Sequence, residues 1–227
     1  MSLNIGFLIF DDVTQLDFTG PLQVLSRIPD AQTYIVAKEL RPIQSDCGPF
    51  LMPSHTPDTC PPLDVICVPG GFGIDAVMED EALLSFLRTQ AEGARYVTSV
   101  CTGAFVLGAA GLLKGVKATT HWAYHEALSA FGAEPVNERV VRDGRFMTGG
   151  GVTAGIDFGL VMAREIAGDT VASAIQLGVE YDPAPVLDSG HPDRAHPALV
   201  EAVKARLAPR IASFNTVVER ITDRAPA

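Results

Sequence analysis

Short apolar runs of strand length alternate with segments of helical pattern along the first half of the chain, and this alternation restricts the fold more than any other feature. The strand-like runs are Asn4–Phe10, Thr33–Ala37, Asp64–Val68 and Tyr96–Val100, and the helical segments are Asp17–Ile28, Glu79–Ala91 and Thr102–Leu112. Residues 41–62 are rich in proline and predict loops with short hairpin strands. Alternating strands and helices predict a single-domain α/β three-layer sandwich, with a mostly parallel sheet and helices on both faces.

The second half adds a hairpin around Asp143-Gly144 and four further helices. These helices are expected at His121–Ala130, Thr153–Ile166, Asp169–Glu180 and about Ala198–Asp223. The last one carries an apolar stripe, made of Val200, Val203, Leu207, Ile211, Phe214, Val218 and Ile221. We expect a homodimer to bury that stripe. Because the chain has no repeat and no long linker, we expect one domain over residues 1–227.

Charge and composition exclude several classes of partner. The 227 residues include 27 acidic and 17 basic side chains, for a net charge of −10 without a basic cluster, so neither a nucleic acid nor an anionic membrane is an expected partner. No basic segment precedes the first apolar run, as a signal peptide would require. The longest uncharged run, Tyr96–Leu113, reads as a buried strand and helix rather than a membrane span. We expect a cytoplasmic protein.

Cys101 is the residue with the strongest chemical indication. It lies where a predicted strand turns into a predicted helix, which is the setting of the nucleophile elbow in other α/β enzymes. The N-terminus of the following helix favours an anion, so we expect the thiol pKa to be lowered. The alternative is a buried structural cysteine, a common occurrence in protein cores.

Two other strand ends converge on the same edge of the predicted sheet. Pro69-Gly70-Gly71 follows the third strand, and the backbone N–H of Gly71 is a candidate oxyanion donor. Asp17 follows the first strand, where it is either an ordinary helix N-cap or an acid facing Cys101. If the two face each other, they are expected to share one charge, since two adjacent anions repel.

The sequence predicts neither a metal site nor an organic cofactor. Cys47, Cys60 and Cys67 lack the spacing of a structural zinc site. His121 and His125 are four residues apart, but no H-E-x-x-H motif accompanies them, and a structural role is the expectation. No G-x-G-x-x-G or phosphate-binding loop occurs.

These segments together resemble the ThiJ/PfpI superfamily, whose fold is that of class I glutamine amidotransferases. The resemblance extends over nearly the whole chain, through NIGFLIFDDVTQLDFTGPLQVL, PPLDVICVPGGFG, YVTSVCTGAFVLGAAGLL, ATTHWAYH and RFMTGGGVTAGIDFGL. Within the superfamily the isocyanide hydratases are the most similar branch. They hydrate an isocyanide to an N-substituted formamide without metal or cofactor, and the resemblance implies a homodimer.

The resemblance implies roles for particular residues. Cys101 matches the nucleophile, Asp17 the partner acid and Thr102 the residue that follows the nucleophile. The backbone of Gly71 and Thr102 is expected to steady charge on a covalent thioimidate. The candidate pocket residues are Phe18, Phe72, Trp122, Gly150 and Val152. Peptidase-like and glyoxalase-like members usually carry a histidine after the cysteine, so Thr102 favours the hydratase branch over another ThiJ/PfpI-type hydrolase.

A sensor domain is the alternative function. AraC-type regulators carry a similar domain, including segments like ATTHW and GGGVTAGID, ahead of a DNA-binding part. Here one amphipathic helix follows the proline-rich loop in place of helix-turn-helix units. A small-molecule sensor that lacks the DNA-binding part therefore remains the second interpretation.

Overall fold

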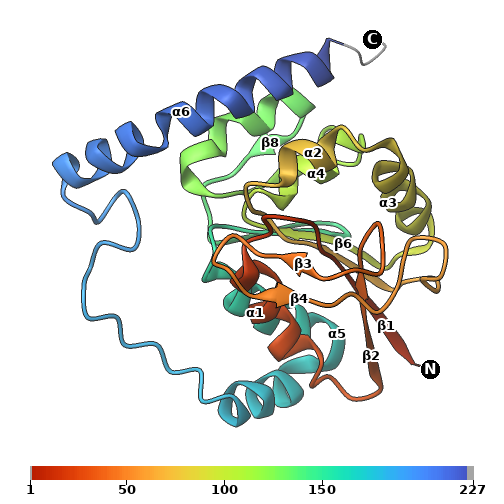
Figure 1. The fold of residues 1–227 in the computed structure, drawn as a ribbon. Helices are drawn as coiled ribbons and strands as arrows, with labels where there is room; N and C mark the ends of the chain where they lie inside the picture. The colour runs from red at the N-terminus through yellow and green to blue at the C-terminus, as the bar shows by residue number, and fades with distance from the viewer. Residues whose placement is uncertain (1, 224–227) are drawn as a thin grey trace.

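The computed structural model describes residues 2–223, and its centre is a six-stranded sheet (Figure 1). The strands are β1 (Leu3–Leu8), β2 (Ala31–Val36), β5 (Val65–Val68), β6 (Tyr96–Val100), β9 (Val140–Asp143) and β10 (Phe146–Gly149), in the order β2-β1-β5-β6-β10-β9. All neighbours are parallel except β9 and β10. The mostly parallel sheet is therefore confirmed. Met1 and residues 224–227, at the ends of the expected domain, lie outside the described residues.

Helices cover both faces of the sheet (Figure 1). On one face α1 (Gln15–Leu25) packs against α5 (Ala154–Gly178), and on the other lie α2 (Ile74–Met78), α3 (Glu81–Gly93) and α4 (Gly103–Ala109). Side chains of β5 alternate between these two cores: Val65 belongs to the first, and Ile66 and Val68 to the second. Burial on both faces explains why this strand is a continuous apolar run in the sequence.

Several elements differ from the expectation in type or extent. The helix expected over 121–130 is a 3₁₀ helix, η1 (Trp122–Phe131). By contrast, the two helices expected on either side of residue 168 are confirmed, since Gly168 at φ +83° is non-helical and divides α5 at that point. The short helix α2 was not expected. Two small sheets, β3 (Ile43–Gln44) with β4 (Phe50–Leu51) and β7 (Lys117–Ala118) with β8 (Glu134–Pro135), complete the fold.

The last helix, α6 (Pro197–Thr222), continues through Pro209 as one helix and lies across the top of the molecule (Figure 1). Its C-terminal half is anchored by Phe214, which is fully buried between the rings of Phe105 and Tyr124. Val218 is buried in the same core. For this half of the helix, the expectation that a second copy covers the stripe is wrong, because the chain's own core covers it.

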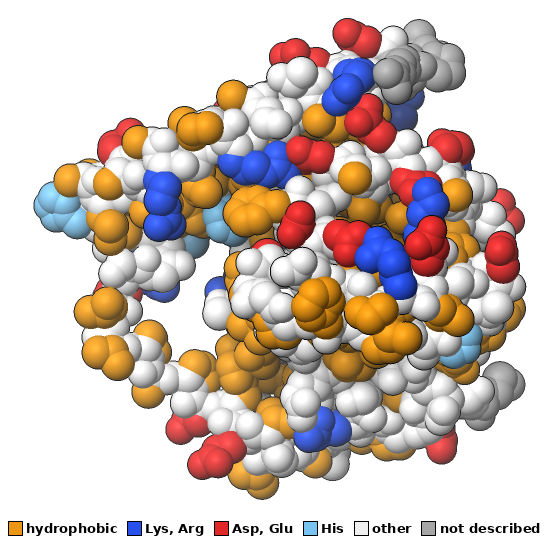
Figure 2. Space-filling model, viewed as in Figure 1, with side chains coloured by type: hydrophobic (Ala, Val, Ile, Leu, Met, Phe, Trp, Pro, Cys, Tyr) orange, Lys and Arg blue, Asp and Glu red, His pale blue; other side chains and the backbone are white. Residues whose placement is uncertain are grey.

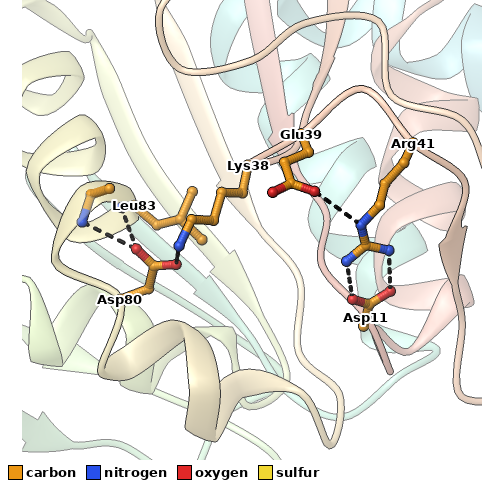
Figure 3. Close-up of polar contacts among 7 residues, drawn as sticks. Asp11, Lys38, Glu39, Arg41, Asp80 and Leu83 are labelled. Atoms are coloured by element: carbon orange, nitrogen blue, oxygen red, sulfur yellow. Dashed lines mark hydrogen bonds and ion pairs between the residues drawn. The ribbon is translucent and has the colours of Figure 1, made fainter.

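Ion pairs hold the connection between β2 and β3 against the rest of the fold (Figure 3). Lys38 pairs with Asp80 at 2.6 Å, and Asp80 also caps α3 by accepting from two backbone N–H groups. Arg41 pairs with Glu39 and with Asp11, which lies in the turn three residues after β1. These contacts fix the start of the segment that leads to Asp46, beside the candidate site. Within residues 2–223, no helix is both long and apolar enough to cross a membrane.

Candidate active site

Cys101 lies in the turn between β6 and α4, and its backbone is held in a left-handed conformation at φ +56°. Its N–H donates to the carbonyls of Gly149 and Gly150 at 2.9 Å each. The Thr120 hydroxyl donates to the Cys101 carbonyl at 2.7 Å. A non-glycine residue in this conformation is strained, and the surrounding hydrogen bonds hold it there. This is the geometry of a nucleophile elbow.

Asp17 is buried inside the fold and does not cap its helix. It is the third residue of α1, whose N-cap is Thr14, and its side chain has 0% exposure. Its Oδ2 accepts a hydrogen bond from the Gly70 N–H at 3.0 Å. Its Oδ1 has no hydrogen-bond partner among the described residues. The interpretation of Asp17 as an ordinary N-cap is therefore wrong.

The glycine pair after β5 positions side chains rather than offering free donors. Gly71 N–H donates to Thr102 Oγ1 at 3.1 Å, just as Gly70 N–H donates to Asp17. The expected oxyanion donor at Gly71 is therefore already engaged by the Thr102 hydroxyl. A Cβ on Gly70 would lie 2.6 Å from the Thr102 nitrogen and 2.9 Å from Asp17 Oδ2, so only glycine fits there.

Asp17 and Cys101 shift each other's pKa. Burial raises the pKa of Asp17 to about 7, although its contacts with Cys101 and Gly70 oppose the shift. Burial, and then the negative charge of Asp17, raise the pKa of Cys101 well above its ordinary value. The N–H groups of Val152 and Thr102 act in the other direction and are outweighed. The expected lowering of the thiol pKa is therefore wrong, because burial and a neighbouring carboxylate exceed the effect of the helix N-terminus. Because both pKa values are raised, the pair carries at most one negative charge near neutral pH.

Val152 carries a second strained backbone beside the elbow. Its φ is +25°, which is rare for a residue branched at Cβ. In this conformation its N–H faces the sulfur of Cys101 and lowers the thiol pKa. The structure thus gives the sulfur two backbone donors, one from Thr102 and one from Val152. The sequence indicated the first of these but not the second.

A cavity of about 270 Å³ opens onto Cys101. Its lining residues are Thr14, Asp46, Gly71, Phe72, Ile74, Cys101, Thr102, His121, Trp122, Tyr124, Val152, Val203, Arg206, Leu207 and Arg210. Three expected pocket residues, Phe72, Trp122 and Val152, lie in this lining. Phe18 does not: it is 2% exposed and packs edge-to-face against Phe7 in the core. Gly150 lines a neighbouring cavity instead.

Sequence reasoning missed one whole wall of the cavity. That wall is the N-terminal half of α6, which contributes Val203, Arg206, Leu207 and Arg210. Val203 and Leu207 belong to the predicted apolar stripe. The stripe therefore indicated an apolar face on this helix, but not that this face lines the cavity. Tyr124 was also missed. Its phenol lines the cavity, and burial raises its pKa above the ordinary value, so it stays protonated.

His121 and His125 do not face a common site. His121 lines the Cys101 cavity, whereas His125 lines a different one. His121 Nδ1 accepts from the Ala123 N–H at 3.2 Å, and burial lowers the pKa of His121, which keeps the ring neutral. Among residues 2–223, no group of three His, Cys, Asp or Glu side chains is placed to hold a metal ion.

Comparison with known proteins assigns the fold of this chain to one family. Residues 4–165 match the DJ-1/PfpI family. The chain belongs to this family. It is 56% identical to the isonitrile hydratase of Pseudomonas putida over 220 residues, which cover 97% of this chain and 96% of that one. It also superposes on the crystal structure of a ThiJ/PfpI family protein from Pseudomonas syringae with a TM-score of 0.92 and 41% identity, covering 98% and 91% of the two chains.

A more distant relative of the chain is a transcriptional regulator. The chain is 29% identical over 188 residues to the HTH-type transcriptional regulator GbdR of Pseudomonas aeruginosa. The match covers 79% of this chain but only 51% of the regulator. A similarity to a transcriptional regulator is therefore present, and it is weaker and shorter than the similarity to the hydratase.

Proposed function

We propose that this protein is an isonitrile hydratase, which adds water to an isocyanide and releases an N-substituted formamide. The observation that carries the proposal is the buried Asp17–Cys101 pair, which lies at a largely apolar and aromatic cavity. The near full-length identity to the hydratase of Pseudomonas putida supports the same reaction. An isocyanide is small and poorly hydrated, and its terminal carbon accepts a nucleophile and a proton at one atom, which suits such a pair.

In the first step the thiol adds to the terminal carbon. The Asp17 carboxylate takes the thiol proton as the sulfur attacks, so the high thiol pKa does not require a free thiolate at rest. The new C–S bond leaves negative charge on the carbon, and Asp17 returns the proton there. The product is a thioimidate, R–N=CH–S–Cys101. No electrons are lost or gained, so the step needs no redox cofactor.

In the second step water adds to the same carbon. Asp17, ionised again, takes a proton from the water as the C–O bond forms and passes it to the substrate nitrogen. The resulting adduct, R–NH–CH(OH)–S–Cys101, then collapses. Its hydroxyl proton returns to the sulfur, the C–S bond breaks and the formamide R–NH–CHO leaves. The sum is one isocyanide and one water converted to one formamide.

We also propose that Thr102 and Val152 steady the sulfur through their backbone N–H groups in both steps. The Thr102 hydroxyl has a separate role, since it accepts from Gly71 and thereby keeps the glycine loop in place. The neighbouring Gly70 then holds Asp17 in reach of the thiol. In this proposal the loop after β5 positions the acid, and α4 and Val152 provide the donors.

The proposal includes a homodimer. Large apolar side chains are exposed around the connection between α5 and α6: Leu177 at 83%, Val186 at 96% and Leu187 at 75%. Figure 2 shows an opening between this connection and the body of the molecule, which a second copy would fill. Light scattering of the purified protein tests this pairing. The cytoplasmic location and the single domain over residues 1–227 stay predictions.

Formamide production by the purified protein tests the main proposal. With an aryl isocyanide, we expect stoichiometric formamide and, on rapid quenching, a Cys101 adduct whose mass equals protein plus isocyanide. A protein that hydrates no isocyanide of a varied panel, yet binds a small ligand at Cys101, would refute the hydratase and favour the sensor. Formamide without any covalent species from a Cys101→Ala variant would refute covalent catalysis.

A further inference from the structure

We propose that Arg206 binds a carboxylate on the R group of the isocyanide, so that the preferred substrates are anionic aromatic isocyanides. This inference rests on the proposed hydratase function and adds the substrate class. It starts from α6, which is the wall of the Cys101 cavity that the sequence did not reveal. The residues that this helix contributes to the cavity include two arginines, Arg206 and Arg210. They differ in whether another group of the protein pairs with the guanidinium.

One face of α6 points into the cavity. Val203, Arg206, Leu207 and Arg210 follow one another at spacings of three, one and three residues, which places them on a single side of the helix. Figure 2 shows Lys and Arg side chains on the side of this helix that faces the body of the molecule. Two guanidinium groups therefore accompany the apolar side chains at the cavity.

Arg210 is already neutralised within the protein. Its guanidinium makes a bidentate ion pair with Asp75 at 2.7 and 2.8 Å and donates to the Phe72 carbonyl at 3.0 Å. It also lies over the Phe72 ring at 5.7 Å. With its carboxylate, carbonyl and ring partners in place, Arg210 fastens α6 to α2 and is not available to a ligand.

Arg206 has no such partner. Every other arginine within residues 2–223 makes a hydrogen bond, an ion pair or a ring contact, whereas Arg206 makes none with the described residues. It is exposed and lines the cavity that holds Cys101. Guanidinium groups bind carboxylates through paired, charge-assisted hydrogen bonds. An anion on the ligand would supply the partner that the protein does not.

The rest of the lining indicates an aromatic body for the same ligand. Phe72, Trp122 and Tyr124 provide ring surfaces, and Val203 and Leu207 provide aliphatic ones. The one carboxylate in the lining, Asp46, accepts a hydrogen bond from the Thr14 hydroxyl at 2.6 Å. The negative charge of Asp46 repels an anionic ligand and therefore weakens the preference for carboxylates that Arg206 creates. Removing the charge of Asp46 is expected to strengthen that preference.

The test compares two substrates that differ in one charge, 4-isocyanobenzoate and its methyl ester. We expect the wild type to favour the carboxylate in kcat/KM, and Arg206→Gln to lower the ratio of carboxylate to ester by about tenfold, or about 1.4 kcal/mol. Asp46→Asn is expected to raise that ratio. Lys204→Gln is the matched control, because Lys204 lies on the same helix, pairs with Glu201 and does not line this cavity. If the carboxylate-to-ester ratio of kcat/KM in Arg206→Gln stays within twofold of the wild-type ratio, the inference is overturned.

A second measurement separates this inference from the hydratase proposal. The product analogue 4-formamidobenzoate is tested for its ability to slow alkylation of Cys101 by iodoacetamide, with 4-formamidotoluene as the neutral comparison. We expect stronger protection by the carboxylate, lost in Arg206→Gln. Such protection without any hydration would refute the hydratase and keep the carboxylate site. Hydration with a carboxylate-to-ester ratio of kcat/KM that does not depend on Arg206 would support the hydratase and refute the carboxylate site.

Discussion

Gly70 and Asp17 are joined by a hydrogen bond that spans 53 positions of the sequence, from the Gly70 N–H to Asp17 Oδ2 at 3.0 Å. The bond connects the end of β5 to the first turn of α1. It holds the carboxyl at the elbow while leaving Oδ1 without a hydrogen-bond partner in the part of the chain that the structure describes. An acid that must take and return a proton needs this combination of a fixed position and a free oxygen.

Gly70→Ala is expected to impair catalysis by displacing this acid. Its methyl group would lie 2.5 Å from Thr102 Oγ1 and 2.9 Å from Asp17 Oδ2, so both side chains must shift. A misplacement of this size in an active site lowers the rate by about 10²-fold. Formamide assays measure the effect. Gly93→Ala is the control, because nothing lies within 4 Å of its added methyl group; equal activity of the two variants would contradict the positioning role.

Cys101→Ala and Cys101→Ser are both expected to be inactive while remaining folded. Alanine removes the sulfur, and serine is a much weaker acid than cysteine, with only a carboxylate beside it to take its proton. Cys47→Ala, at an exposed cysteine outside the cavity, is the control and should retain wild-type turnover. Circular dichroism establishes folding, and steady-state formamide formation measures activity. A serine variant with substantial turnover would show that the sulfur is not required.

Asp17→Asn is expected to lower turnover by about 10²–10⁴-fold, the contribution of a positioned acid or base. Asparagine keeps an oxygen for the Gly70 N–H but cannot carry the transferred proton. Because Asp17 is not an N-cap, loss of helix capping does not complicate the comparison. Turnover within threefold of the wild type would exclude proton transfer by this residue.

The pH dependence of activity follows from the raised pKa of Asp17. Because the proposed reactive form has an ionised carboxyl beside a neutral thiol, kcat/KM should rise with pH and level off above a pKa of about 7. The Asp17→Asn variant should not show this rise of kcat/KM with pH. A pH profile of the two proteins with one neutral isocyanide is the measurement, and a wild-type profile flat between pH 5.5 and 8.5 would contradict the assignment.

Stability should change with pH in the opposite direction. A buried carboxyl whose pKa is raised to about 7 binds a proton more tightly in the folded than in the unfolded chain. The stabilisation of the folded protein by this proton binding is therefore fully present below the pKa of an unfolded aspartate, about 3.9. It is lost as the pH rises through about 7. Melting curves should show that Asp17→Asn gains stability relative to the wild type between pH 5 and pH 8. A constant difference would mean that Asp17 does not titrate in this range.

Phe214→Ala is expected to cost about 3–5 kcal/mol of folding free energy, as for other fully buried aromatic side chains. It should also raise KM, because Phe214 anchors the helix whose other half forms a wall of the cavity. Val186→Ala, at a side chain 96% exposed, is the control for stability. Denaturant unfolding and substrate titration give the two values. An unchanged KM in a destabilised variant would separate the anchor from the cavity wall.

The sheet and the elbow could be predicted because their signals are local. Burial on both faces makes β5 a continuous apolar run, and Cys101 stands at the junction of a strand and a helix. Gly168, at φ +83°, breaks α5 where the sequence predicted two helices. In each of these cases a few adjacent residues determine the outcome.

The electrostatics and the cavity could not be predicted, because they depend on contacts between distant segments. The N-terminus of α4 predicted a lowered pKa for Cys101, but the burial of the thiol and the approach of Asp17, 84 positions earlier, reverse the sign. Phe18 follows Asp17 directly, yet it faces the core while Asp17 faces the elbow. The stripe on α6 predicted an apolar surface without indicating which half covers the active site.

The segment that matches the DJ-1/PfpI family ends at residue 165, whereas the wall formed by α6 begins at Pro197. The proposed reacting pair and the α6 wall of the cavity thus lie in separate stretches of the chain. Exchanging residues 179–223 between related hydratases should change the part of the substrate preference that α6 sets, while Phe72, Trp122 and the Cys101 elbow stay those of the recipient. Substitutions in α6 can therefore change which ligand fits the cavity without altering the sequence of the elbow.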